Sequence, residues 1–172
     1  YMDLLKNYKI DEYFVIDKAP LNFQWIGFIK IFFPQSKIIH CKRDSKDNCL
    51  SLYKNSFASD DINWSYDQEE LIEYYGFYED LMNFWKSKFP SFIYDISYEE
   101  IVADQETTTK NLLKFCELSW DPNCLKYYEH NKKQIDTFSI IQARKPIYQS
   151  SVKLFNRYSK YLKLFSSRLK DS

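Results

Sequence analysis

The stretch "SKIIHCKRDSKDNCLSLY", residues 36–53, decides the fold class of this 172-residue chain. Its first part, Lys37 to Cys41, is a short run rich in isoleucine, which is typical of a strand buried on both faces. Its second part passes through charged residues to Ser45, where the pattern favours the start of a helix. A strand that leads directly into a helix is the repeating unit of an α/β fold.

Two further runs have the same character as this strand, "YFVID" at residues 13–17 and "FIYDI" at residues 92–96. We expect all three runs to be parallel strands. Apolar residues recur at helical spacing over residues 22–33, 67–88 and 107–118, and a last helix places apolar residues on one stripe. The sequence therefore predicts a single α/β domain over residues 1–172, in which helices flank a central parallel sheet. The stripe of the last helix contains Val152, Phe155, Leu162, Phe165 and Leu169.

Composition excludes several classes of site. The chain has only two glycines, Gly27 and Gly76, so it lacks both common glycine-rich phosphate loops. Its four cysteines form no CxxC pair and only two histidines accompany them, so we expect no metal site. Few cysteines also fit a reducing, cytoplasmic compartment. Neither a membrane-spanning apolar run nor a secretion signal is visible in the sequence.

The formal net charge of zero hides an uneven distribution of charge. Residues 60–106 contain 13 acidic side chains and two lysines, whereas residues 131–172 contain 10 basic side chains and two aspartates. The C-terminal part is therefore a candidate for binding an anion. The alternative is that these charges belong to solvated helix faces. We expect no nucleic-acid partner.

Arg43 and Ser51 are the strongest candidates for such an anion site. Arg43 lies at the carboxyl end of a predicted parallel strand, where open α/β sheets bind ligands. Ser51 lies six residues into the predicted helix, about 9 Å along its axis. A guanidinium and a hydroxyl at this separation suit a phosphate dianion. The alternative is that Arg43 pairs with Asp44 or Asp47 and that Ser51 is a packing residue.

Five motifs, in order along the chain, resemble the sulfotransferase family. The resemblance is greatest to bacterial enzymes that carry tetratricopeptide repeats and are related to tyrosylprotein sulfotransferases. It implies a P-loop-like three-layer fold and 3′-phosphoadenosine 5′-phosphosulfate as the sulfate donor. It also implies that Arg43 and Ser51 hold the 3′-phosphate of this nucleotide. The motifs are "DKAPLNFQWIGFIKIFFPQSKIIHCKRDSKDNCLSLYKNSF", "YEDLMNFW", "ISYEEIVAD", "LLKFCELSWD" and "QARKPIYQSSVKLFNRY".

The resemblance implies roles for five more residues. Tyr98 matches a tyrosine near the adenine, although a strand-end core aromatic is the alternative. Arg144 and Lys145 resemble a basic pair that closes over the nucleotide, with a solvated loop as the alternative. Ser139 matches a serine that contacts the nucleotide. Lys18 resembles the catalytic lysine near the transferred sulfuryl group, unless it merely pairs with the preceding aspartate.

The chain also departs from the family pattern. Family members have a loop of the type PRSGTT that wraps the 5′-phosphosulfate, followed by an acidic or histidine general base. The chain matches the region after that loop, so we expect it to be the C-terminal portion of a longer protein. The resemblance thus implies a sulfotransferase that acts on a hydroxyl or phenol acceptor, including a peptide, with this chain binding one end of the donor. The alternative is a non-catalytic α/β fragment or partner-binding module that has kept the fold without the active loop.

Overall fold

The structure is a computed structural model that describes residues 14–57, 60–130 and 145–170. At its centre, strands β1 (Ile38–Lys42) and β2 (Ile93–Ser97) form a parallel sheet. The register pairs Ile38 with Ile93 and Lys42 with Ser97, so the two strands end side by side. Two of the three predicted strands are thereby confirmed.

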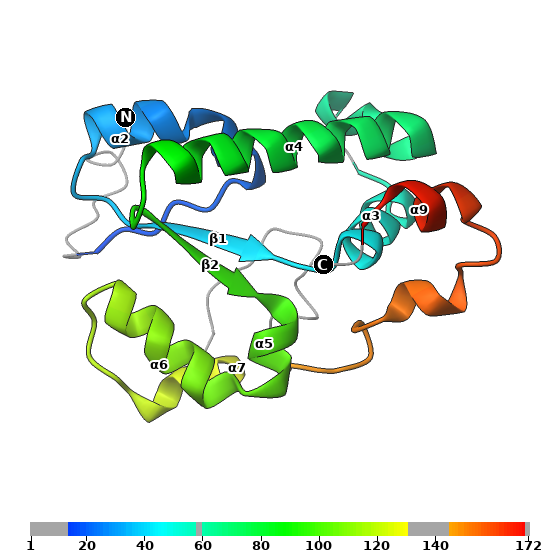
Figure 1. Ribbon diagram of the computed structural model, residues 1–172. Coiled ribbons are helices and arrows are strands. Elements are labelled where there is room, and N and C mark those ends of the chain that lie inside the picture. The colour runs from blue at the N-terminus through cyan, green and yellow to red at the C-terminus, as the bar shows by residue number, and fades with distance from the viewer. Residues whose placement is uncertain (1–13, 58–59, 131–144, 171–172) are drawn as a thin grey trace.

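Helices lie on both sides of this small sheet (Figure 1). Helices α2 (Ile26–Phe32) and α4 (Gln68–Lys88) form one layer, and α5 (Tyr98–Ala103) and α6 (Gln105–Phe115) form the other. Helix α3 (Ser45–Lys54) continues from the end of β1. The predicted α/β class with a flanked parallel sheet is confirmed. The shorter elements are η1 (Pro20–Trp25), η2 (Asp60–Tyr66), η3 (Pro122–Lys126), α7 (Tyr127–His130), η4 (Leu154–Arg157) and α9 (Lys163–Arg168).

Helix α4 follows its sequence pattern closely. The Asp67 carboxylate caps its start by accepting hydrogen bonds from the Glu69 and Glu70 amides, at 2.8 and 3.1 Å. The helix ends at Lys88, two residues before Pro90, which cannot continue it. Its 21 residues form the longest helix in the described part of the chain, and no described helix has the length and apolar character to span a bilayer.

The predicted strand at residues 13–17 is wrong over its described part, because residues 14–17 form no strand. A strand needs a neighbour that accepts and donates backbone hydrogen bonds, and in the described residues β1 pairs only with β2. Phe14, Val15 and Ile16 are also 57%, 46% and 90% exposed. An apolar, β-branched run predicts a strand only when a pairing partner is present.

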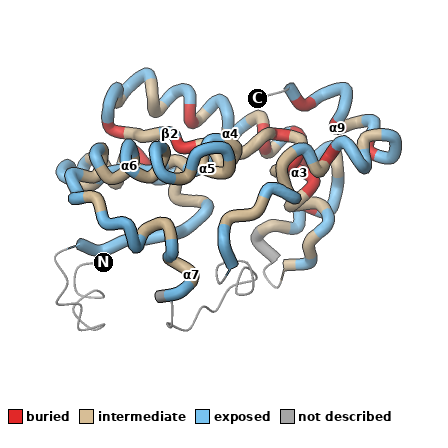
Figure 2. Tube along the Cα trace, turned by 90° about the horizontal axis from the view of Figure 1, so that it is seen from below, coloured by how far each residue is buried: buried red, intermediate tan, exposed pale blue. Residues whose placement is uncertain are grey.

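The predicted C-terminal helix is also wrong in detail, because a 3₁₀ turn (η4) and the short helix α9 replace it. Its apolar stripe is nonetheless correct, since Phe155, Leu162, Phe165 and Leu169 are all buried. They join residues of α3 and α4, among them Leu71, in the larger of two core clusters. Figure 2 shows buried segments of the C-terminal region gathered beside α3. The core thus fastens the C-terminal segment to the helix that follows β1.

A second cluster lies between α2, α4 and the start of β2, where Ile26, Met82 and Phe92 are buried. The helices approach closely at Gly27, where an added Cβ would lie 2.7 Å from Cη2 of Trp85. Trp85 is itself anchored, because its indole N–H donates to the Phe23 carbonyl at 2.9 Å. A glycine is therefore required at this crossing, and Gly27 supplies it.

Candidate functional site

The junction between β1 and α3 places Arg43 at the carboxyl edge of the sheet. Asp44 caps α3, since its carboxylate accepts a hydrogen bond from the Asp47 amide at 2.9 Å. This cap stops the strand at Lys42 and leaves Arg43 as the single residue between strand end and cap. Ser97 pairs with Lys42 in the register, so Tyr98, the next residue, is brought to the same edge.

Arg43 makes three contacts at this edge. Its Nη2 donates a hydrogen bond of 2.6 Å to the Ser151 carbonyl and lies 3.8 Å from Oδ2 of Asp47. Its guanidinium carbon lies 5.4 Å from the centre of the Tyr98 ring, a cation–π arrangement. The alternative in which Arg43 pairs with Asp47 is thus realised in the structure. Arg43 can still donate a further hydrogen bond, because its Nε is buried without a hydrogen-bond acceptor among the described residues.

Asp47 is the buried anion of the site, with a side chain that is 0% exposed. Its Oδ1 accepts a hydrogen bond of 2.7 Å from the Phe155 amide. Its Oδ2 faces Arg43 and has no hydrogen-bond partner in the described part of the chain. Asp47 therefore ties three segments together, namely the strand end, α3 and the C-terminal segment. The sequence suggested Asp47 only as an alternative partner for Arg43.

Ser51 lies one helical turn after Asp47, and residues four apart share a helix face. It is half-buried, and its backbone carbonyl accepts a hydrogen bond from the side-chain amide of Asn55 at 2.8 Å. Among the described residues, the Ser51 hydroxyl has no hydrogen-bond partner. Arg43 reaches Asp47 from the strand end, so the three side chains follow one side of α3.

Tyr98 links Arg43 to the C-terminal segment. Its hydroxyl donates to the Tyr148 carbonyl at 2.8 Å, while its ring faces the guanidinium. Burial raises the pKa of the Tyr98 phenol, so it remains a donor at neutral pH. The structure therefore places two of the predicted site residues, Arg43 and Tyr98, in direct contact.

Residues 145–153, which we call the strap, cross this edge of the molecule (Figure 1). Three strap carbonyls, spaced three residues apart, each accept a hydrogen bond from a side chain of a different element. Tyr127 donates to Lys145 at 2.7 Å, Tyr98 to Tyr148 at 2.8 Å and Arg43 to Ser151 at 2.6 Å. These three bonds hold the strap through its backbone. Sequence reasoning missed Tyr127, since no local pattern shows which carbonyl a distant tyrosine will reach.

The other predicted site residues are less connected. Lys18 is exposed in the segment before η1, and no contact joins it to Arg43 or Tyr98 among the described residues. The Lys145 side chain is exposed at the start of the strap. Ser139 and Arg144 lie outside the described residues. No group of three metal-binding side chains occurs in the described ranges.

A second polar cluster, absent from the sequence predictions, lies in the middle of the sheet. His40 on β1 contacts Asp95 on β2 through Nδ1 at 2.8 Å and the Tyr78 hydroxyl on α4 through Nε2 at 2.5 Å. Lys86 donates to the other Asp95 oxygen at 2.5 Å, and Lys42 lies 3.6 Å from that oxygen. The strand register, which pairs His40 with Asp95, is the signal that would have found this cluster.

Burial controls the ionisation of this cluster. It lowers the pKa of His40 by disfavouring the imidazolium, although Asp95 acts in the opposite direction. Burial also raises the pKa of Tyr78 to about 12. Partial burial acts to raise the pKa of Asp95, but hydrogen bonds from Lys86 and His40 outweigh it and lower that pKa. A neutral imidazole therefore bridges a phenol and a carboxylate, which fastens α4 to both strands.

Comparison with known proteins identifies a family for this chain. A model described as "Sulfotransferase family" matches residues 1–122. The chain is also 35% identical over 164 residues to an uncharacterized protein of Aquifex aeolicus (strain VF5). That alignment covers 94% of this chain and 21% of the Aquifex protein, so the chain spans about a fifth of that relative's length. The family match includes Arg43, Ser51 and Tyr98, and the strap lies beyond it.

Proposed function

Because the chain belongs to the sulfotransferase family, we propose that it binds the 3′-phosphate and adenine end of 3′-phosphoadenosine 5′-phosphosulfate. The sulfuryl group of this donor is transferred to a hydroxyl or phenol acceptor, peptides included. The observation that most directly supports the proposal is the position of Arg43. It lies at the carboxyl end of β1, against the Tyr98 ring and below the strap.

The chemistry of Arg43 fits a phosphate ligand. A guanidinium carries five N–H donors in a planar fork that matches phosphate oxygens. The Ser151 carbonyl accepts from Nη2 only, and Nε has no acceptor among the described residues. Asp47 fixes the side chain from the buried side, which limits the conformational entropy lost on binding. We assign the remaining donors of Arg43, together with the Ser51 hydroxyl, to the 3′-phosphate.

The remaining assignments extend from this phosphate. Tyr98 is proposed to contact the adenine, and Ser139, Arg144 and Lys145 to contact the nucleotide from the C-terminal side. Lys18 is proposed as the catalytic cation. During transfer the acceptor oxygen loses its proton to a general base and bonds to sulfur, while the bond from sulfur to the bridging oxygen breaks and 3′-phosphoadenosine 5′-phosphate leaves. An ammonium there would stabilise the charge that develops on the bridging oxygen. None of the described acids is assigned as the general base.

Calorimetry with two nucleotides tests the 3′-phosphate site. We expect 3′-phosphoadenosine 5′-phosphate to bind more tightly than AMP, because only the former has the 3′-phosphate. Arg43→Ala should remove most of this difference, about 10- to 100-fold in affinity for charged hydrogen bonds. Arg157→Ala is the control, since Arg157 is exposed on η4. Equal affinity of the wild-type chain for both nucleotides would contradict the proposal.

A second variant separates binding from folding. Arg43→Ala leaves the buried Asp47 carboxylate without its counter-charge, which can destabilise the chain. Arg43→Lys keeps the charge but loses the planar fork, so it should retain the fold and still lose much of the preference for the 3′-phosphate. If Arg43→Lys, shown to be folded by circular dichroism, keeps the full preference, Arg43 does not hold the 3′-phosphate.

A further inference from the structure

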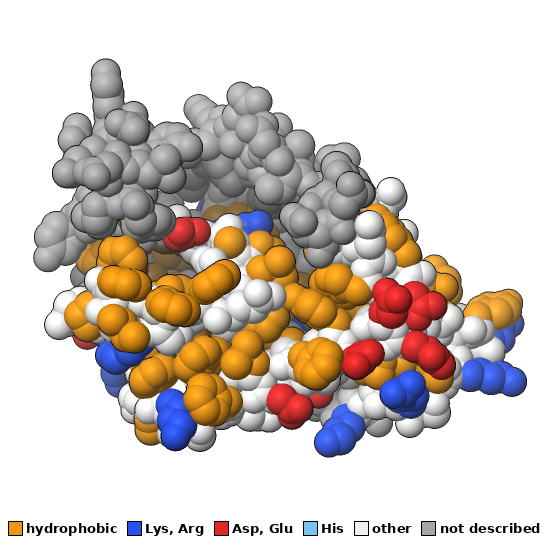
Figure 3. All heavy atoms as spheres, turned by 90° about the horizontal axis from the view of Figure 1, so that it is seen from above, with side chains coloured by type: hydrophobic (Ala, Val, Ile, Leu, Met, Phe, Trp, Pro, Cys, Tyr) orange, Lys and Arg blue, Asp and Glu red, His pale blue; other side chains and the backbone are white. Residues whose placement is uncertain are grey.

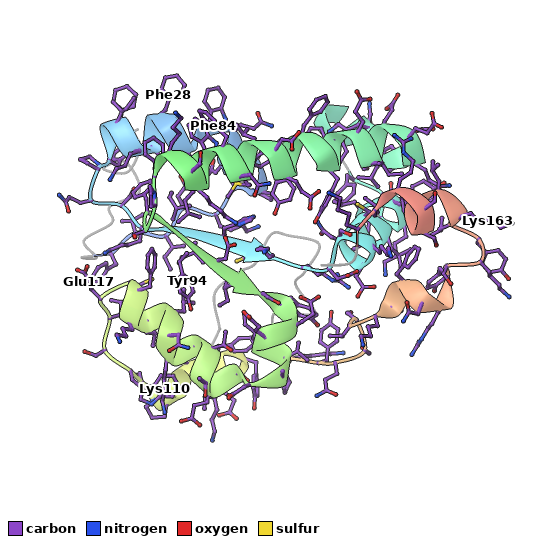
Figure 4. The ribbon with its side chains drawn as sticks, in the orientation of Figure 1. Phe28, Phe84, Tyr94, Lys110, Glu117 and Lys163 are labelled. Carbon is purple, nitrogen blue, oxygen red and sulfur yellow. The ribbon has the colours of Figure 1, made fainter. Side chains whose placement is uncertain are left out.

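The outer surface of α2 and α4 is unusually apolar. Figure 3 shows hydrophobic side chains running across this face, and in Figure 4 Phe28 and Phe84 point outward from the neighbouring helices. Monomeric soluble proteins rarely expose a contiguous patch of large apolar side chains without a function for it. We call this surface the α2–α4 face. Its exposed members are Trp25 (54%), Phe28 (56%), Ile31 (71%), Phe32 (69%), Phe77 (63%) and Phe84 (46%).

The part of this face on α4 has an ordered pattern. Glu73, Phe77, Asp80, Phe84 and Lys88 recur at spacings of three and four, so they form one stripe along the helix. All five are exposed. The buried residues of α4, among them Leu71, Tyr75 and Met82, lie on the opposite side. The stripe therefore points directly away from the core, with an acidic residue at one end, a basic residue at the other and two aromatic rings between them.

We propose that two copies of this chain associate through antiparallel contact of their α4 stripes. The positions 73 and 88 have the same midpoint as 77 and 84, between residues 80 and 81. A two-fold axis at that midpoint sets Glu73 of each copy opposite Lys88 of the other. It also sets Phe77 of each copy opposite Phe84 of the other. One patch is thus complementary to itself, as a two-fold interface requires.

The surface beside the stripe also suits contact with a second copy of the chain. A hollow of about 340 Å³ lies beside the stripe and is lined mainly by aromatic and aliphatic side chains. It can accept an aromatic ring of the opposing helix, and the rings on α2 extend the apolar contact. The lining residues are Phe23, Gln24, Tyr74, Phe77, Tyr78 and Leu81.

One residue of the stripe opposes this association. Asp80 lies next to the axis, so dimerisation brings two like charges near each other. Asp80→Asn should therefore tighten the dimer, whereas it would have no such effect if the face bound a basic partner through Asp80.

Charge reversal tests the antiparallel register. Within one chain Glu73 and Lys88 lie 15 residues apart, about 22 Å along the helix, so they cannot compensate for each other. Glu73→Lys alone places two lysines opposite each other at each end of the contact, and Lys88→Glu alone places two glutamates there. Each single variant should dissociate about ten-fold more readily than the wild-type chain in low salt. Sedimentation velocity over a dilution series of the 172-residue chain measures this.

Mixing the two single variants gives the decisive result. In a heterodimer of Glu73→Lys with Lys88→Glu, both cross-helix pairs are again opposite in charge, so association should recover. The controls are Glu129→Lys on α7 and Lys126→Glu on η3, which make the same charge changes outside α4 and should leave association unchanged. Circular dichroism verifies that each variant is folded.

Three outcomes would overturn the proposal. The wild-type chain could remain monomeric at its highest soluble concentration, in which case another partner covers the face. Both single variants could associate as well as the wild-type chain. The mixture could also fail to recover the affinity that the folded single variants lose, which would exclude the antiparallel register.

Discussion

At the scale of single residues, His40 is the most constrained polar side chain of the sheet. Both ring nitrogens are engaged, one by Asp95 and the other by Tyr78, and the side chain is only 11% exposed. Lys86 and Lys42 also face this cluster through Asp95. Because burial lowers the pKa of His40, this imidazole is protonated at a lower pH in the folded chain than in the unfolded chain.

Stability should therefore fall in mild acid. The unfolded chain protonates His40 near its ordinary pKa of 6.5, whereas the folded chain does so only at lower pH. The free energy of unfolding should decrease as the pH falls below about 6.5, by at most about 1.4 kcal/mol per pH unit from this group, until the folded-state pKa is passed. Urea unfolding between about pH 7.5 and 5.5 measures the slope.

The variant His40→Gln is the control, because glutamine does not titrate. The second histidine, His130, and all carboxyl groups are common to both chains. The difference between the two chains in the slope of unfolding free energy against pH is therefore due to His40. Parallel curves for the two chains would show that His40 is free to protonate in the folded state.

At the scale of the elements, the packing of α2 on α4 depends on which glycine lies at the crossing. Gly27 faces Trp85, but a Cβ added at Gly76 on α4 would meet no atom within 4 Å beyond its chain neighbours and the nearby backbone of its own helix. The chain thus contains a glycine that packing requires and one that packing does not require, both in helices. The same substitution should have opposite effects at the two positions.

Gly27→Ala should destabilise the chain and Gly76→Ala should stabilise it. At position 27 the methyl group overlaps the anchored Trp85 ring, and overpacking of this kind costs about 1–3 kcal/mol. At position 76 only the helix propensity changes, which favours alanine by about 0.5–1 kcal/mol. Urea unfolding of the two variants gives both signs. A Gly27→Ala chain as stable as the wild type would mean that Trp85 moves aside easily.

The elements also show what the sequence can predict. The long helix at 67–88 was predicted almost residue by residue from its apolar period, and the cap at Asp67 and the proline that follows the helix are local signals too. The strands at 37–41 and 92–96 were predicted to within one residue. The segment at 13–17 has a similar apolar composition, but its described part, residues 14–17, forms no strand, because strand formation depends on pairing and pairing is not a local property. For the same reason Arg43 was found from its place after a strand, whereas Tyr127 and the His40 cluster were not.

At the scale of the whole molecule, the strap connects the two sides of the sheet. Its carbonyls accept from Tyr127 on α7, from Tyr98 on α5 and from Arg43 after β1, while Phe155 just beyond it donates to Asp47. These bonds place the C-terminal segment over the ends of both strands. The proposed nucleotide site therefore depends on contacts between parts of the chain that are far apart in sequence.

Removing either tyrosine hydroxyl should loosen the strap without unfolding the core. Tyr98→Phe and Tyr127→Phe each delete a hydrogen bond to a strap carbonyl, worth about 1 kcal/mol, and keep the ring. Amide hydrogen exchange over residues 145–153 should accelerate in both variants. Tyr161→Phe is the control, since Tyr161 is 70% exposed. Unchanged exchange in both strap variants would mean that other contacts hold the segment.

The manner in which the strap is held also affects how freely its sequence can change during evolution. Every amino acid, proline included, supplies a main-chain carbonyl, so the acceptors at 145, 148 and 151 survive any substitution there. The donors have no such freedom, because only particular side chains at 43, 98 and 127 can reach these carbonyls. The side chains of the strap can thus vary, while residues 43, 98 and 127 elsewhere in the chain continue to fix the path of its backbone across the sheet edge.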